Sequence, residues 1–176
     1  MTKFSKAIVF VVALLLPCAS VFAQLGTSTT SDKATTTAII VAPLTITTSA
    51  DLHFGAMLSP TSSGTATVSP SGGWSGSGVL QANGSPTVSA AEFDVVGVDN
   101  AVVYITLPAS SYYVSNGTIQ DDMEVKGFTS NHSSGNLTLD INGEGTIKVG
   151  ATLYLAANQP EGTYTNAAGL EVTISY

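Results

Sequence analysis

The sequence predicts an all-β protein, an antiparallel β-sandwich of about nine strands. No stretch of its 176 residues repeats apolar side chains at the 3.6-residue period of an amphipathic helix. Gly, Pro, Asn, Asp and Ser recur every few positions between short runs rich in Val, Ile, Thr and Tyr. These two observations favour short strands joined by turns, with a helix content close to nil.

Residues 1–23 have the features of a secretory signal peptide. Lys3 and Lys6 precede the apolar run 7–16, Pro17 ends that run, and Ala23 offers a cleavage point. The run is much shorter than the roughly 20 residues that a membrane span needs, and no later stretch is longer and equally apolar. We therefore expect export through the periplasm to the exterior or the cell surface, without a membrane span.

The single cysteine, Cys18, allows a second interpretation of this end, in which Leu15-Leu16-Pro17-Cys18 is a lipoprotein box and Cys18 is acylated. Proline directly before the cysteine fits that box poorly. With cleavage after Ala23, the mature chain contains no cysteine and no disulfide, although its destination is oxidising. Stability must then come from burial and β-pairing.

The mature chain of 153 residues would be a single acidic domain, residues 35–176, after a Thr/Ser-rich flexible lead-in at 24–34. It keeps three lysines and no arginine against twelve acidic residues, a formal charge of −9. Phosphate contacts need a basic surface, so this charge argues against a nucleic-acid partner and against anionic lipid.

The first strand is expected within residues 35–47, "TTTAIIVAPLTIT", where Pro43 marks an edge or a kink because it cannot donate a ladder hydrogen bond. Leu52, Phe54 and Met57 then enter the core. Residues 64–70 and 76–84 are interpreted as short strands that bracket a Gly/Ser-rich hairpin or loop around Trp74. Trp74 is a candidate loop contact for a sugar or another subunit, although folding back over the end of the sandwich is the favoured alternative.

Period-2 alternation is clearest in the second half of the chain and defines most of the expected core. The runs 91–98, 101–108 and 122–128 are three strands, and "LTLDINGEGTIKVG" gives two more across an Asn142-Gly143 turn. Residues 151–165 add one strand, and the chain ends on another. About nine strands suffice for two packed sheets of the immunoglobulin-like type. The expected inward residues are Phe93, Val95, Val103, Ile105, Leu107, Met123, Val125, Leu137, Leu139, Ile141, Ile147, Val149, Leu153, Leu155, Leu170, Val172, Ile174 and Tyr176, with Tyr104 on the opposite face.

No enzymatic chemistry is recognisable in the sequence. His53 and His132 lack the spacing of metal ligands, and "GGWSGSG" lacks the final glycine of a nucleophile elbow. Asp121, Asp122 and Glu124 are the densest acidic cluster, but a solvated strand edge explains them better than a calcium site. We expect no catalytic, cofactor or metal site.

Two segments resemble a bacterial secreted family, domain of unknown function 4402. They are "AIIVAPLTITTSADLHFG" near the start and "VGATLYLAANQPEGTYTNAAGLEVTISY" at the end. The shared features are the Pro43-Leu44 step, Phe54-Gly55, the corner Gly162-Thr163-Tyr164 and the alternating terminal strand. The layout is also loosely similar to chaperone-usher pilin subunits and to spore-coat-protein-U-like domains, which implies a pilin-like sandwich.

The pilin resemblance implies a role for both ends of the domain. A periplasmic chaperone would hold the terminal strand in the register Leu170, Val172, Ile174 and Tyr176, an outer-membrane usher would export the chain, and subunits would polymerise by strand addition. Two features depart from pilins: the disulfide is absent, and residues 24–33 offer only Leu25 as an apolar donor residue. A donor taken from residues 34–44, with Ile39, Val41 and Leu44, would cost the domain its own first strand.

Two functions remain open from the sequence. The first is a secreted, non-enzymatic structural protein of the cell surface, a pilus-like, fimbria-like or coat subunit assembled by β-strand pairing. The second is a stand-alone monomeric secreted module whose loops hold a carbohydrate or matrix ligand. The sequence leaves open whether the sandwich is self-complete or completed by a donated strand.

Overall fold

The computed structural model describes residues 29–84, 86–118 and 121–176, and these residues form ten strands and no α-helix. The predicted fold class, an all-β antiparallel sandwich, is confirmed. The expected signal peptide and Cys18 lie outside the described residues. The chain divides into the units Met1–Ala38 and Ile39–Tyr176. In the first unit, residues 29–38 have no regular structure and are exposed; the second unit contains all the strands.

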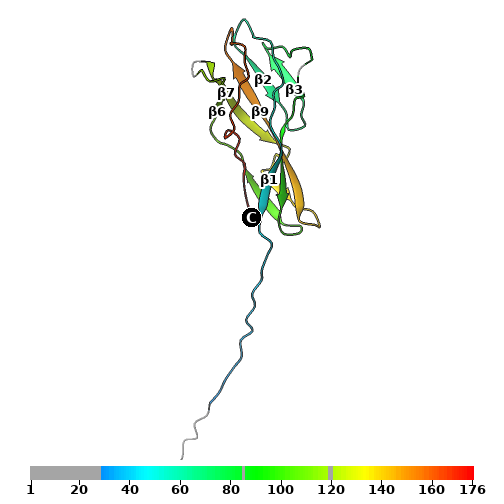
Figure 1. The fold of residues 1–176 in the computed structure, drawn as a ribbon. Helices are drawn as coiled ribbons and strands as arrows, with labels where there is room; N and C mark the ends of the chain where they lie inside the picture. The colour runs from blue at the N-terminus through cyan, green and yellow to red at the C-terminus, as the bar shows by residue number, and fades with distance from the viewer. Residues whose placement is uncertain (1–28, 85, 119–120) are drawn as a thin grey trace, which may run out of the picture. The chain divides into compact units, whose positions relative to one another are not determined.

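The larger sheet is built around β9, which pairs with three other strands. β4 pairs with the first half of β9, β2 pairs with the second half, and β7 runs along the opposite edge of that second half. β1 extends the sheet beyond β4, β3 beyond β2, and β6 beyond β7 (Figure 1). The strands are β1 (Thr45–Ala50), β2 (Gly64–Val68), β3 (Trp74–Ser77), β4 (Ala91–Val96), β6 (Tyr112–Val114), β7 (Met123–Ser130) and β9 (Glu144–Leu155).

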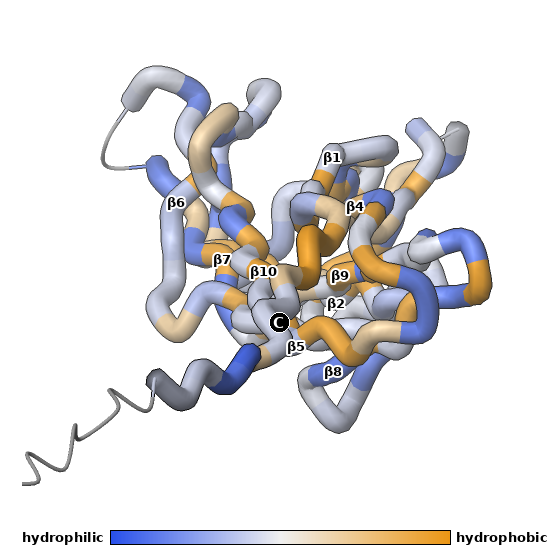
Figure 2. Tube along the Cα trace, turned by 90° about the horizontal axis from the view of Figure 1, so that it is seen from below, coloured by the Kyte–Doolittle hydropathy of each residue, from blue (hydrophilic) through white to orange (hydrophobic). Residues whose placement is uncertain are grey.

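The smaller sheet has the order β10-β5-β8, with β5 (Val102–Thr106), β8 (Asn136–Thr138) and β10 (Thr173–Ser175). β8 leads through a turn directly into β9, so this turn connects the two sheets. In Figure 2, seen from below, β5 and β8 lie on one side and β1 and β4 on the other, with apolar residues in both groups. The sandwich therefore has two layers in its lower half, which is the half that contains β1 in Figure 1.

The core consists of two clusters. The lower core cluster contains the fully buried Val103, Ile147 and Val149 between the two sheets. The upper core cluster gathers around Val125 and Leu153, where β2, β7 and β9 meet. Leu52 and Phe128 pack against both clusters, so the two halves are one continuous apolar interior.

Gly150 marks the point at which β9 changes partners. Val149 pairs with Ala91 of β4, and Ala151 pairs with Val68 of β2. A Cβ atom at position 150 would clash with the carbonyl oxygen of Val68 and with the backbone that follows it. Glycine is therefore required here so that two strands can follow one another along β9. The two strands expected on either side of Gly150 are in fact one twelve-residue strand.

Three expected boundaries differ from the structure. The first strand begins at Thr45 rather than Thr35, after Pro43, whose missing N–H excludes it from a ladder. Trp74 begins β3 instead of lying in a loop, and residues 78–84 form only an isolated bridge through Gln81. Tyr112–Val114 form β6, a strand that sequence reasoning missed although "YYV" is rich in strand formers.

Ile141 was expected in the core but is 75% exposed. The turn begins one residue earlier than the Asn142-Gly143 pair suggested, because the Oδ1 atom of Asp140 accepts the backbone N–H groups of Asn142 and Glu144, both at 2.8 Å. These bonds fix Asp140 at the base of the turn and place Ile141 at its tip. Leu137 and Leu139 are buried as predicted.

The upper end of the domain is held by the Tyr164 hydroxyl, in the Gly162-Thr163-Tyr164 corner. The hydroxyl donates to the Pro160 carbonyl at 2.9 Å and accepts from the side-chain amides of Asn116 and Gln159, each at 3.1 Å. Gln159 is buried, and its amide also donates to the Asp121 carbonyl. The connection between β6 and β7 and the connection between β9 and β10 are thereby tied together.

Replacing Ile147 with alanine should lower the free energy of unfolding by about 2–5 kcal/mol, because the side chain is fully buried between the sheets. The matched variant Ile141→Ala removes the same atoms from an exposed position and should change stability by less than about 0.5 kcal/mol. Urea denaturation of both variants measures the difference. Equal losses would contradict the placement of the β8–β9 turn.

Replacing Asp140 with asparagine should remove a pH-dependent part of the stability. The N–H groups of Glu144 and Asn142 lower the pKa of the Asp140 carboxyl. Since the unfolded value lies near 3.9, the stabilisation is fully present above that pH and is lost as the pH falls through the lower folded pKa. We expect the difference in unfolding free energy between wild type and Asp140→Asn to shrink as the pH falls from neutral through and below the unfolded pKa. A constant difference in urea titrations would rule out this role.

Candidate functional site

The candidate site lies at the edges of the two sheets. Within the part of the chain that the structure describes, β1 pairs only with β4, and β10 pairs only with β5. Each strand therefore leaves one row of backbone N–H and C=O groups without a partner strand. Such an edge is a ready template for another strand.

Both edges border the lower core cluster. Ile46 on β1 and Ile174 on β10 pack against this cluster but are only partly buried, as are Leu44 and Leu170 next to the two strands. Apolar surface is therefore left uncovered on the side where both strands end their sheets. A third strand that paired there would cover it.

Tyr176 links the two edges at their lower end. Its hydroxyl accepts the backbone N–H of Val98 at 2.9 Å and donates to the Ala42 carbonyl at 3.4 Å. In Figure 1 the C-terminus accordingly lies beside the start of β1. Gly97 fits beneath this contact, since a Cβ atom there would lie 2.6 Å from the hydroxyl and 3.0 Å from Leu44.

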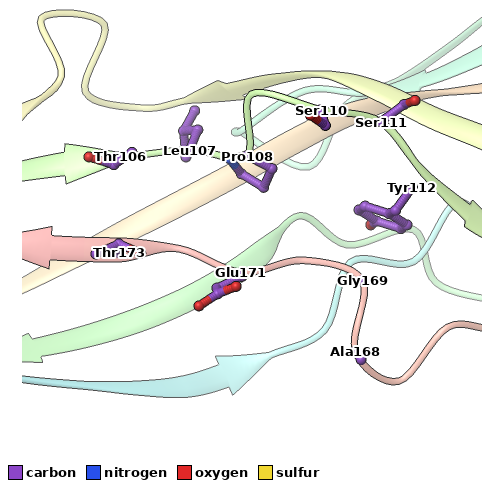
Figure 3. Close-up of a pocket in the computed structure, with 10 residues that line it drawn as sticks. All are labelled: Thr106, Leu107, Pro108, Ser110, Ser111, Tyr112, Ala168, Gly169, Glu171 and Thr173. Atoms are coloured by element: carbon purple, nitrogen blue, oxygen red, sulfur yellow. The ribbon is translucent and has the colours of Figure 1, made fainter.

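The terminal segment follows the expected alternation of inward residues only in part. Val172 is buried, Leu170 and Ile174 pack against the lower core cluster, and Tyr176 bonds through its hydroxyl. Only residues 173–175 form a strand. The register that pairs Thr173 with Thr106 would continue through Leu107 to Pro108, which has no N–H to donate to the ladder. Beyond this point the two segments separate around a hollow of about 310 Å³ (Figure 3).

The segment before β1 is the second part of the candidate site. Ile39, Ile40 and Val41 are 83%, 97% and 59% exposed, and residues 39–43 have no regular structure. Leu44 differs from them because it packs against the lower core cluster and so belongs to the domain. Ile39 and Val41 therefore lie outside β1, and a donor taken from residues 35–43 costs the domain no strand of its own.

The other residues singled out in the sequence have local structural roles. The Trp74 ring packs against the upper core cluster and over Gly76, where a Cβ atom would clash with it. His53 is exposed, and its Nδ1 atom accepts the N–H of Gly55 at 2.9 Å. His132 bonds through Nε2 to the Thr146 carbonyl at 3.0 Å.

The expected acidic cluster does not gather into one group of ligands. Glu124 lies on β7 and bonds to Lys126, whereas Asp121 contributes its carbonyl to the Gln159 amide. Among the described residues, no three His, Cys, Asp or Glu side chains are arranged to hold a metal ion. In the same part of the chain, no helix is long and apolar enough to cross a membrane.

A family model described as a domain of unknown function, DUF4402, matches residues 44–176. The chain belongs to this family. The match begins at Leu44, so the DUF4402 domain includes β1 and β10 and leaves out the exposed segment with Ile39 and Val41. No curated protein and no solved structure matches the chain significantly.

Replacing Tyr176 with phenylalanine should lower the free energy of unfolding by about 0.5–1.5 kcal/mol, because Val98 and Ala42 lose their shared partner. Tyr104→Phe is the matched control, since this tyrosine is exposed on the outer face of β5. Urea denaturation of both variants measures the effect. A loss no larger than that of Tyr104→Phe would show that the hydroxyl does not link the two edges.

Proposed function

We propose that this DUF4402 protein is a secreted, non-enzymatic structural subunit of the bacterial cell surface that assembles into a polymer by β-strand pairing. The observation that carries the proposal is the pair of free edges, on β1 and β10, which border a partly uncovered core. A pilus-like, fimbria-like or coat assembly would use these edges in every copy.

The composition of the two edge strands supports this proposal. Natural proteins usually protect an exposed edge with lysine, proline or a bulge that prevents pairing. Neither β1, "TITTSA", nor β10, "TIS", contains a charged residue or a proline. β1 has one irregularity, between Thr48 and Ala50, and its first four residues pair regularly. Both edges are therefore chemically suited to accept a strand.

We propose residues 35–43 of a second copy as the strand that is accepted. In an extended strand, Ile39 and Val41 point to the same face, and Ile40 points to the other. With Ile39 and Val41 inward, the segment would cover Ile46 and Ile174 and form backbone hydrogen bonds along both edges. Burial of each inward side chain would contribute about 1.5–3 kcal/mol before the cost of ordering the segment.

This mode of assembly implies partners during export. Before a neighbouring copy is available, the free edges and the partly buried Ile46 and Ile174 would be prone to incorrect pairing. A periplasmic chaperone that occupies the same edges would prevent this, and an outer-membrane usher would exchange it for the next subunit. The formal charge of −9 after signal-peptide removal continues to disfavour a nucleic-acid partner.

A monomeric binding module that uses Trp74 in a loop is the weaker alternative. Trp74 is the first residue of β3 and packs against the upper core cluster, so its ring is turned toward the interior. A ligand held by loops would therefore have to use other side chains.

Ile39→Asp and Val41→Asp should each abolish assembly, because a carboxylate cannot enter the apolar site between the edges. Ile40→Asp is the matched control, since it adds the same charge to the opposite face of the same exposed segment. The measurement is an immunoblot of material sheared from the cell surface, run in SDS with and without boiling. We expect a ladder that collapses on boiling for wild type and Ile40→Asp, and a single band for the other two variants.

Two results would contradict the proposal. A single wild-type band in both lanes would indicate a self-complete monomer. A ladder that persists in Ile39→Asp and Val41→Asp would exclude residues 35–43 as the donated strand.

A further inference from the structure

On the outer face of the upper half of the large sheet, the paired strand residues that the structure describes carry polar or aromatic side chains. Cross-strand pairing places these side chains in two rows that run across β6, β7, β9, β2 and β3. No aliphatic side chain stands in either row, whereas the inward residues of the same strands form the upper core cluster. We call this surface the tyrosine face; its first row is Tyr113, Glu124, Tyr154, Thr65 and Ser77, and its second is Lys126, Thr152, Thr67 and Ser75.

Two tyrosines protrude from the first row. Tyr113 is 54% exposed and Tyr154 is 39% exposed, and Glu124 pairs with both from the strand between them. Because neighbouring strands are about 4.8 Å apart, the backbone positions of the two tyrosines are separated by roughly 10 Å. Each aromatic ring provides an apolar surface with a polar tip, in a row of hydrogen-bonding groups.

The charges on this face balance one another. The Nζ atom of Lys126 lies 2.6 Å from Oε2 of Glu124 and 4.1 Å from the ring centroid of Tyr154. The hydrogen bond to Lys126 lowers the pKa of Glu124, and the same bond raises the pKa of Lys126. Both groups are therefore ionised near neutral pH, and the tyrosine face is neutral in a chain with a formal charge of −7.

This arrangement matches the chemistry of a neutral sugar chain. A pyranose ring has an apolar face of C–H groups that packs on an aromatic ring, and hydroxyl groups around its rim that donate and accept hydrogen bonds. Two tyrosines whose backbone positions are about 10 Å apart would contact residues of one extended oligosaccharide. Glu124, Lys126 and Thr152 would bond to the hydroxyls between them.

On this face, charge complementarity favours a neutral sugar chain over an anionic polymer. The only cation of the face, Lys126, is already paired with Glu124, so an anionic polymer would find no free positive charge there. A neutral polyhydroxyl chain needs no counter-charge and meets a carboxylate, an ammonium group and hydroxyls.

We propose that the tyrosine face is a binding site for a neutral, extended oligosaccharide, which would stack on Tyr113 and on the side of the Tyr154 ring opposite Lys126. This site is independent of the free edges, because it uses neither β1 nor β10. It also differs from a loop site around Trp74, which faces the interior.

The test is a binding titration of the full secreted chain with cellohexaose, chitohexaose and mannohexaose, and with an alginate hexamer as the anionic probe. We expect at least one neutral probe to bind. Tyr113→Ala and Tyr154→Ala should each weaken binding of that probe by about tenfold or more, as loss of an aromatic anchor does at other binding sites. Tyr104→Ala is the matched control, because Tyr104 is equally exposed on the outer face of the other sheet.

Tyr154→Phe keeps the ring, so it should retain most of the affinity even if an alanine variant unfolds. The proposal is overturned if wild type binds none of the three neutral probes, if the alginate hexamer binds more tightly than all of them, or if Tyr104→Ala weakens binding as much as Tyr113→Ala. The unboiled SDS ladder of Tyr113→Ala should match that of wild type. Failure of sugar binding is thereby distinguished from failure of strand assembly.

Discussion

Backbone pairing along the twelve residues of β9 is the constraint on which the rest of the structure depends. β4, β2 and β7 all pair with this strand, and its inward residues Ile147, Val149 and Leu153 contribute to both core clusters. The absence of a side chain at Gly150 lets two partner strands share one edge of β9. Because pairing with β9 and the inward residues determine the position of these strands, their outward side is available for polar and aromatic groups.

The two halves of the domain are built from different sets of strands. In the upper half, β2, β3, β6 and β7 surround β9, and the Tyr164 hydroxyl connects the loops above them. In the lower half, the larger sheet ends at β1, and the smaller sheet ends at β10 and at β8. The hydrogen bonds of the Tyr176 hydroxyl join the β1 and β10 edges at one end only. Strand pairing is assigned to the lower half because β1 and β10 border the lower core cluster there, and ligand binding to the upper half because the tyrosine face lies there.

Local alternation was sufficient to predict the class and most of the core, because inward residues such as Phe93, Val103 and Val125 depend only on the period of their own strand. The errors occurred where a distant or side-chain effect ends a strand: Pro108 limits β10, and the Asp140 carboxylate turns Ile141 outward. The sequence placed Ile39 and Val41 within the first strand, and the structure places both before it, because β1 begins only at Thr45. The tyrosine face could not have been predicted, because Tyr113 and Tyr154 meet only through the register of β6, β7 and β9.

The two proposed sites would reinforce each other in an assembled surface. Strand pairing at β1 and β10 occupies the lower half, so each added copy would contribute one more uncovered tyrosine face. A face with two tyrosines and one ion pair is a small site, and a single copy would hold a sugar chain weakly. Repetition along a polymer raises the effective concentration of sites, and avidity can then exceed single-site affinity by about 10²–10⁴-fold without a new contact. A weak site on a repeating subunit is therefore sufficient for firm attachment to a polysaccharide, and selection for a deep pocket in each copy would not be required.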